Sequence, residues 1–295
     1  MANRFLERLA SPGAVLFDGA MGTQLSARGA RPGPAALLEA PQTVAAVHDA
    51  YRRAGAEVLL TNTLTANRLA LSYEKLQSRQ PEIVSTACRL ARAAAGAKGF
   101  VAGDIGPTGD FLQPVGDLTE AEAGGIFEEL ARALAEAGVD LFVIETFTEA
   151  RETALAIRAC KRVAPSLPVA ATMSFDPARD GFRTNAGVSA GDAAQAMAEA
   201  GADFVGANCG SVTPEQMPGL VARFRERTNL PLLIQANAGL PELHGEQVIF
   251  RLGPQEYAQG MLQTVRAGAR LIGGCCGTSP AHIQALRQAL DAAGI

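Results

Sequence analysis

The stretch Ala269-Arg270-Leu271-Ile272-Gly273-Gly274-Cys275-Cys276-Gly277-Thr278-Ser279-Pro280 contains, in order, the signals of a strand, a turn and a helix start. Its apolar run around Leu271 and Ile272 is typical of a short buried strand. Two adjacent cysteines, Cys275 and Cys276, then lie in a glycine-rich turn, and Pro280 opens a helical pattern. A strand, a turn and a helix in this order indicate one unit of a parallel sheet.

The same unit recurs along the whole chain. The expected strands are residues 14–18, 58–61, 100–104, 141–145, 169–174, 204–209, 232–236 and 271–275. The expected helices are residues 43–54, 66–76, 82–97, 119–137, 149–163, 190–200, 214–226, 254–267 and 280–293. Eight strand–helix units in a chain of this length predict an α/β fold, a single (β/α)8 TIM barrel occupying residues 1–295 as one domain.

The composition is typical of a globular enzyme, with 48% hydrophobic and 19% charged residues. The net charge is −4 and no basic cluster is present, so we expect no nucleic-acid partner. No apolar run is long enough to span a membrane, and residues 1–8 lack the apolar core of a signal peptide. Five cysteines without an export signal favour a reducing compartment, so we expect a cytoplasmic protein with no membrane partner.

Three cysteines share one sequence setting, at the end of an expected strand. Cys209 closes the run Phe204-Val205-Gly206-Ala207-Asn208, much as Cys275 and Cys276 follow theirs. In a barrel, such positions converge on one mouth, and three thiolates form an incomplete ligand set for zinc with a fourth position left for water or substrate. Two alternatives remain at this point: small buried residues, because cysteine is often buried, and a disulfide.

Barrel active sites lie at the carboxyl ends of the strands. Polar residues end several of the expected strands, namely Asp18, Thr61, Asp104, Glu145, Ser174, Asn208 and Asn237. Any single one could simply mark the transition to solvent, but cysteines and carboxylates at several ends indicate a site. Two connections, residues 105–118 and 238–253, are longer than the fold requires, and long ordered loops on this face are usually functional.

Three separated motifs resemble those of the homocysteine-binding zinc methyltransferase family, the homocysteine S-methyltransferases. They are Asp18-Gly19-Ala20-Met21-Gly22-Thr23, Gly206-Ala207-Asn208-Cys209 and Gly273-Gly274-Cys275-Cys276. Within the family, the chain is most similar to the homocysteine domain of cobalamin-dependent methionine synthases. Further support comes from Gly103-Asp104-Ile105-Gly106-Pro107-Thr108-Gly109 and Ala236-Asn237-Ala238-Gly239.

The resemblance implies the following roles. Cys209, Cys275 and Cys276 would bind one zinc ion, and the homocysteine sulfur would complete the tetrahedron. Asp18, Glu145 and the backbone amides of Ala20–Thr23 would hold the amino and carboxylate groups of the substrate. Asn237 would occupy the open metal position before substrate arrives. The complete set of expected substrate contacts is Asp18, Gly19, Ala20, Met21, Gly22, Thr23, Glu145, Asn208 and Asn237.

The ligand type fits thiol alkylation. A thiol of pKa near 8.5 is mostly protonated at neutral pH, and zinc deprotonates a coordinating thiol. Three protein thiolates leave the metal centre with a charge of about −1, so a bound substrate thiolate should stay nucleophilic, whereas imidazole ligands suit water activation better. The glycines Gly19 and Gly22 are expected to let backbone amides approach a carboxylate closely.

The methyl donor is expected to be methylcobalamin, held on a corrinoid partner domain or protein, in an enzyme of methionine biosynthesis. Cationic donors such as betaine are often held by aromatic rings, and this chain has no Trp and three Tyr. One alternative is a stand-alone homocysteine methyltransferase that uses S-methylmethionine or another small donor. An alternative of another class is a structural or storage zinc barrel. A metal-free lyase or aldolase would need a lysine at a strand end, and no expected strand ends in one.

Overall fold

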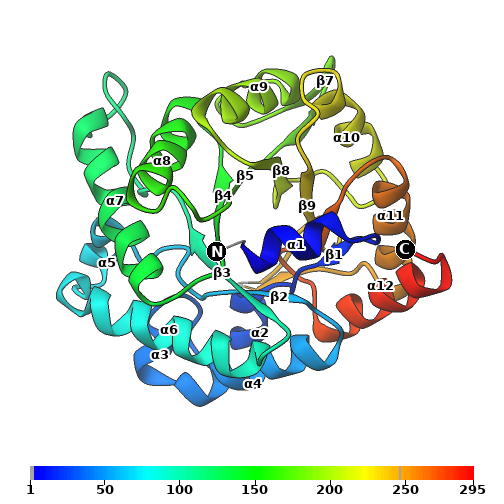
Figure 1. The fold of residues 1–295 in the computed structure, drawn as a ribbon, viewed down its shortest axis with the longest axis horizontal. Coiled ribbons are helices and arrows are strands. Elements are labelled where there is room, and N and C mark those ends of the chain that lie inside the picture. The colour runs from blue at the N-terminus through cyan, green and yellow to red at the C-terminus, as the bar shows by residue number, and fades with distance from the viewer. Residues whose placement is uncertain (1–2, 246) are drawn as a thin grey trace.

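Eight parallel strands form a barrel in the computed structural model, which describes residues 3–245 and 247–295 (Figure 1). The barrel strands are β1 (Val15–Leu16), β2 (Val58–Leu60), β3 (Phe100–Ile105), β4 (Leu141–Phe147), β5 (Val169–Met173), β8 (Phe204–Asn208), β9 (Leu232–Ala236) and β12 (Leu271–Gly274). Their order in the sheet is β1-β12-β9-β8-β5-β4-β3-β2. This arrangement confirms the predicted (β/α)8 class of fold.

The first and second strands bring the sheet back on itself. Phe17 and Val58 form a parallel bridge, and the amide of Asp18 donates to the carbonyl of Val58 at 3.0 Å. Because the amide in this hydrogen bond belongs to Asp18, closure of the barrel also fixes the backbone of this predicted site residue at the mouth.

Helices surround the strands (Figure 1). They are α1 (Arg4–Ala10), α2 (Met21–Ser26), α3 (Ala36–Glu39), α4 (Pro41–Arg53), α5 (Arg68–Tyr73), α6 (Gln80–Ala95), α7 (Glu120–Glu136), α8 (Ala150–Val163), α9 (Ala190–Ala200), α10 (Met217–Arg225), α11 (Pro254–Arg266) and α12 (Pro280–Ala292), with a 3-10 turn at Gln77–Arg79. Local sequence explains their starts: Thr119 and Glu122 form a capping box at α7, and Pro280 lies in the first turn of α12.

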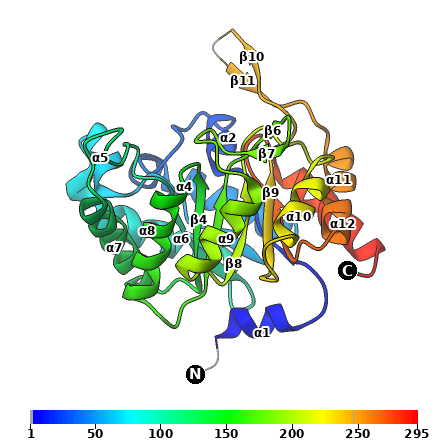
Figure 2. The ribbon, with the colours of Figure 1, turned by 90° about the horizontal axis from the view of Figure 1, so that it is seen from above.

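The amino-terminal helix α1 lies across the end of the barrel opposite the site (Figure 2). Its Phe5 side chain is fully buried, with its ring centroid 5.3 Å from that of Phe100 and 5.9 Å from that of Phe204. Both contacts are edge-to-face, the arrangement that aromatic pairs prefer. The helix therefore completes the interior core at this end and leaves the other mouth for chemistry.

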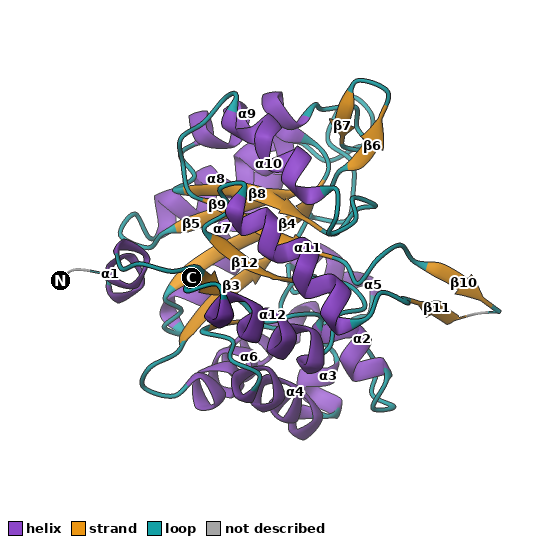
Figure 3. Ribbon diagram, turned by 90° about the vertical axis from the view of Figure 1, so that its right-hand side faces the viewer, coloured by secondary structure: helices purple, strands orange, loops and turns teal. Residues whose placement is uncertain are grey.

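One of the two expected long connections contains a hairpin. Residues 238–253 contain an antiparallel hairpin, β10 (Glu242–His244) and β11 (Gln247–Ile249), which projects from the mouth (Figures 2 and 3). A second hairpin, β6 (Asp176–Ala178) and β7 (Gly181–Arg183), follows β5 and was not expected. Strand β4 extends two residues beyond Glu145 through an irregular register, which turns the chain at the mouth. Among the helices that the structure describes, none is both long and apolar enough to cross a membrane.

Candidate active site

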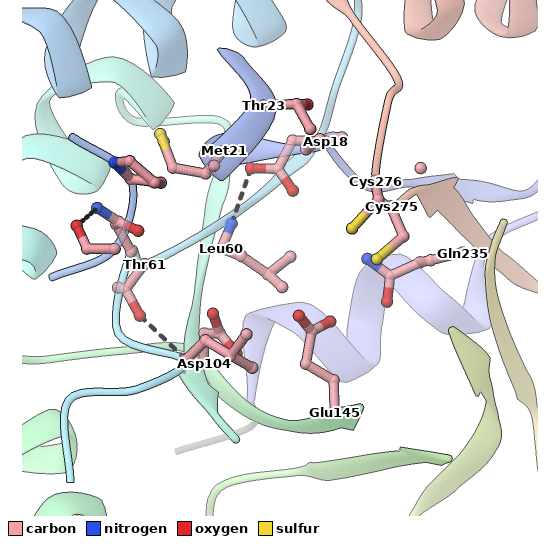
Figure 4. Close-up of a pocket in the computed structure, with 18 of the residues that line it drawn as sticks. Asp18, Met21, Thr23, Leu60, Thr61, Asp104, Glu145, Gln235, Cys275 and Cys276 are labelled. Carbon is pink, nitrogen blue, oxygen red and sulfur yellow. Dashed lines mark hydrogen bonds between the residues drawn. The ribbon is translucent and has the colours of Figure 1, made fainter. Parts of the chain in front are cut away.

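A cavity of about 280 Å³ opens at the carboxyl ends of the barrel strands (Figure 4). Its walls come from the ends of β1, β2, β3, β4, β9 and β12, so segments far apart in sequence meet there. Predicted site residues in its lining are Asp18, Gly19, Ala20, Met21, Gly22, Thr23, Glu145, Cys275 and Cys276.

The three predicted cysteines lie together. The sulfur atoms of Cys209, Cys275 and Cys276 all fall within 4.8 Å of one another, and those of Cys209 and Cys276 are 3.9 Å apart. Zinc–sulfur bonds of about 2.3 Å at tetrahedral angles place ligand sulfurs about 3.8 Å apart. A disulfide would need about 2 Å, and all five cysteines of the chain are unpaired. The group therefore fits a zinc ion.

The three thiols shift one another's pKa values in opposite directions. The neighbouring thiols of Cys275 and Cys276 hold the pKa of Cys209 well below its ordinary value. The contact with Cys209 in turn raises the pKa of Cys275 and the pKa of Cys276, because a second negative charge beside the first is unfavourable. A dication at this point would remove that repulsion and favour three thiolates.

Tight turns hold the cysteines in place. Cys209 adopts a φ of +56°, which non-glycine residues seldom do. A Cβ on the next residue, Gly210, would lie 2.2 Å from the carbonyl oxygen of Phe175, so only glycine fits. At the other turn, Gly277 has a φ of +78° and packs against the Phe250 ring. The turn at Cys209 thus holds backbone strain, as functional sites often do, whereas glycine adopts the conformation of the other turn without strain.

Asn237 lies beside the cysteine group. Its Nδ2 donates to the carbonyl of Gly210 at 2.8 Å, which places the amide next to Cys209. Its Oδ1 is buried and has no hydrogen-bond partner among the described residues. Buried carbonyl oxygens are normally paired, so the lone pairs of this atom remain available to accept a hydrogen bond or to coordinate a metal.

Three buried carboxylates face the cavity: Asp18, Asp104 and Glu145 (Figure 4). Asp18 accepts a hydrogen bond from the amide of Leu60 at 3.0 Å. Burial raises the pKa of Asp18, despite that bond, and burial together with the charges of Glu145 and Asp18 raises the pKa of Asp104. Burial and then the charge on Cys209 raise the pKa of Glu145 to about 8. Among the described residues, no basic side chain lines the cavity to pair with these carboxylates.

Asn208 has a different environment from the one expected. Its side chain is fully buried, and it is not part of the cavity lining. It accepts from the Thr146 amide at 2.8 Å and from the Thr172 hydroxyl at 2.7 Å, and it donates to the Thr146 hydroxyl at 2.8 Å. Its Nδ2 also lies 3.7 Å from the Cys275 sulfur. Asn208 therefore links the end of β4, just after Glu145, to the cysteine group.

Residues 19–23 follow the first strand and include the first turn of helix α2. The amide of Ala20 donates to Thr278 Oγ1 at 3.0 Å, so this amide is already used. A Cβ at Gly19 would lie 2.5 Å from Thr278 Oγ1, which means that this glycine is required for packing. A Cβ at Gly22 would meet only Pro32, at 3.7 Å, so no contact within the described protein requires glycine there. The first amides of α2 lack intrahelical acceptors, and the residues that carry them line the cavity.

Asp104 and Gln235 are polar lining residues to which the sequence analysis assigned no role. Asp104 is the penultimate residue of β3, a position that the sequence indicated but did not distinguish from a simple strand end. Gln235 lies within β9, and its Oε1 is buried without a hydrogen-bond partner in the described chain. The signal for Gln235 was a polar residue inside an apolar run, because strand alternation directs it into the barrel.

Comparisons with known proteins agree with this geometry. Residues 15–290 match the family model for homocysteine S-methyltransferase. The chain is 31% identical over 313 residues to betaine–homocysteine S-methyltransferase 1 of Danio rerio, covering 97% of this chain and 75% of that protein. It is 29% identical over 296 residues to methionine synthase of Mycobacterium tuberculosis, covering 94% of this chain but only 24% of that protein.

A solved structure is similar over nearly its whole length. The metallated form of the homocysteine methyltransferase MmuM from Escherichia coli superposes with a TM-score of 0.77 at 26% identity, covering 97% of this chain and 98% of that one. The matching family model spans most of the sequence, including all three motifs and the cysteine group. The chain therefore belongs to the homocysteine S-methyltransferase family.

Proposed function

We propose that this barrel transfers a methyl group to the thiol of homocysteine, giving methionine, and that the methyl group arrives on cobalamin carried by a partner domain or protein. The main support for this proposal is that a group of three cysteines lies beside a cavity lined by buried carboxylates. Under this proposal, residues 1–295 act as one homocysteine-binding domain in a reducing, cytoplasmic compartment.

Different walls of the cavity bind different parts of the substrate. Asp18 and Glu145 bind the α-ammonium group, because buried carboxylates that face no basic side chain need a cation. The amides of Met21, Gly22 and Thr23 bind the α-carboxylate at the start of α2. Ala20 contributes its position only, because its amide donates to Thr278.

The thiol end of the substrate points toward Cys209, Cys275 and Cys276. Bound by these three residues, zinc would lower the pKa of the incoming thiol and supply a thiolate at neutral pH. Asn237 Oδ1 is available as the occupant of the fourth position until substrate arrives. Asn208 acts as a positioning residue, since it fixes the β4 end and contacts the Cys275 sulfur.

The cavity wall supports a donor that is not an ammonium compound. Among the described residues, no aromatic side chain lines the cavity, so a quaternary ammonium would find no aromatic cage there. Phe111, on the connection after β3, is 70% exposed and outside the lining. The extra length of the methionine synthase relative, of which this chain matches about a quarter, is consistent with a donor held elsewhere.

Donor choice can be tested with the zinc-loaded protein and homocysteine. Methylcobalamin, S-methylmethionine and betaine are each supplied alone, and methionine is measured by mass spectrometry. We expect methionine from methylcobalamin and none from betaine. Faster turnover with S-methylmethionine than with methylcobalamin would establish the stand-alone alternative instead.

A purely structural or storage role for the metal is the alternative of another class. The three cysteines are only partly buried, and Cys275 and Cys276 line the cavity, whereas a metal that only stabilises the fold would be expected inside the core. A chelator should therefore abolish homocysteine binding while lowering the unfolding midpoint by only a few degrees. A collapse of global stability with the chelator would support the structural role.

A further inference from the structure

Asp104 is the one carboxylate of the cavity to which neither the family resemblance nor the sequence assigned a role. It is the penultimate residue of β3, which pairs with β4 through the Asp104–Val143 and Ile105–Ile144 registers. Its side chain is only 5% exposed and lines the cavity that Asp18 and Glu145 also line. Figure 4 shows the three carboxylates around the same space, with Met21 above and the cysteines to one side.

The backbone of Asp104 is held firmly. Its amide donates to Thr61 Oγ1 at 2.9 Å, and Thr63 Oγ1 donates to its carbonyl oxygen at 2.7 Å. The two threonine hydroxyls also bond to each other at 2.6 Å. These hydrogen bonds come from the segment directly after β2, so the protein itself fixes the backbone that carries the Asp104 side chain.

The side chain itself is not fully used. Asp104 Oδ1 is buried and has no hydrogen-bond partner in residues 3–245 and 247–295. A buried carboxylate oxygen that serves only the fold is normally paired, since leaving it unpaired is costly. No Arg, Lys or His of the described chain lines the cavity, so the protein supplies no cation for this oxygen.

We propose that Asp104 accepts the third N–H of the substrate α-ammonium group, alongside Asp18 and Glu145. This inference rests on the proposed function, in which Asp18 and Glu145 take two of those bonds. A primary ammonium carries three donors, so three surrounding carboxylates would pair every N–H. The site would then recognise a primary amine specifically, because removing the amino group leaves three buried carboxylates unpaired.

The test compares homocysteine with 4-mercaptobutyrate, which is the same molecule without its amino group. Calorimetric titrations use zinc-loaded protein with Asp104→Asn, which keeps the shape, and with Asp104→Ala, which removes the acceptor. We expect homocysteine to bind about 10- to 100-fold more weakly to both variants, as for loss of a hydrogen bond to a charged group. Binding of 4-mercaptobutyrate should be unchanged or tighter. Equal weakening of both ligands, or no weakening of homocysteine, would overturn the proposal.

Asp117→Asn is the matched control. Asp117 is an exposed carboxylate on the connection that follows β3. Its substitution by Asn therefore removes the same charge as Asp104→Asn without changing the cavity lining. It should leave both affinities unchanged; a loss equal to that of Asp104→Asn would mean that net charge alone explains the effect and would also overturn the proposal.

Thermal unfolding of the metal-free variants gives a second readout. Asp104→Asn removes a buried, unpaired carboxylate, so the midpoint should stay equal or rise, whereas a structural Asp104 would make it fall. Failure of the proposed function is recognised separately, because the unsubstituted protein would then bind neither zinc nor either thiol. If it binds both thiols and Asp104→Asn binds homocysteine equally well, only the inference about Asp104 is lost.

Discussion

The hydroxyl of Thr278 joins the metal turn to the substrate loop: its Oγ1 accepts from the amide of Ala20 at 3.0 Å and donates to the carbonyl of Cys275 at 2.7 Å. The two loops lie at opposite ends of the chain, yet this fully buried side chain holds them in one register. Tyr51 strengthens the link, because its hydroxyl donates to the carbonyl of Ala20 at 2.9 Å.

Thr278→Val should loosen this register. The substitution leaves the Ala20 amide and the Cys275 carbonyl without their partner, so we expect a loss of about 1–3 kcal/mol in unfolding free energy. Zinc content should stay at one per chain while KM for homocysteine rises. Thr278→Ser keeps the hydroxyl and is the control: recovery of the KM in that variant is expected. A Thr278→Val enzyme with unchanged KM would show that the link does not position the substrate.

Glu145 should make the stability of the metal-free protein depend on pH. Burial, then the charge on Cys209, raise the pKa of Glu145 from 4.5 to about 8. The folded state therefore favours the protonated acid. Its stabilising contribution is complete below pH 4.5 and is lost as the pH rises through about 8.

Chemical denaturation of the metal-free protein between pH 5 and pH 9 measures this effect. The free energy of unfolding should fall by a few kcal/mol across that range. Glu145→Gln should flatten the slope, since the amide stays neutral throughout. Zinc and homocysteine together should also reduce the slope by supplying positive charge. Identical slopes for the native protein and the variant would exclude Glu145 as the source.

His48 should act in the opposite direction at lower pH. Burial lowers the pKa of His48 from 6.5 to about 4, and neither of its ring nitrogens has a partner in the described chain. The folded state favours the neutral ring, so its contribution is present above pH 6.5 and is lost as the pH falls through about 4.

His48→Leu should remove that loss. The native protein should be destabilised by roughly 3 kcal/mol on acidification through this range, and the variant by correspondingly less. The variant should also retain its zinc and its homocysteine affinity, because His48 is not in the cavity lining. If the free energy of unfolding falls equally at acid pH with and without His48, other groups cause the loss.

Phe5→Ala tests the division of the barrel into a core end and a reactive end. Phe5 is fully buried against Phe100 and Phe204, so truncation should cost about 3–5 kcal/mol in unfolding free energy. At a temperature where the variant stays folded, KM and kcat should match those of the native enzyme. Leu6→Ala is a control on the same helix, since Leu6 is exposed and should cost little.

Much of this molecule could be predicted from residue patterns. Apolar runs followed by helical patterns identify the eight barrel strands, because each parallel strand is buried on both faces. The three cysteines could be grouped in advance because strand ends meet at one mouth. The sulfur atoms of Cys209 and Cys276 are 3.9 Å apart in the structure, although their positions differ by 67 in sequence.

Other features depend on contacts that no local pattern encodes. The β10–β11 hairpin was expected only as a long connection, because its residues Leu243 and Val248 are exposed and give no buried alternation. Asn208 looked like a substrate contact at a strand end, but its hydrogen bonds to Thr146 and Thr172 become visible only when β4 and β5 are placed beside it. Asp104 could be placed at the mouth from the sequence. That its Oδ1 has no hydrogen-bond partner among the described residues is visible only in the folded structure.

Zinc content measured together with homocysteine binding tests the central claim most directly, in the native protein, in Cys209→Ala and in Cys88→Ala. Cys88 is a buried cysteine outside the group and serves as the control. We predict one zinc per native chain, with homocysteine binding that releases a proton and disappears on chelation. Cys88→Ala should behave like the native protein, and Cys209→Ala should lose both zinc and binding. A fully reduced native chain that binds homocysteine without zinc, or holds no zinc, would contradict the account.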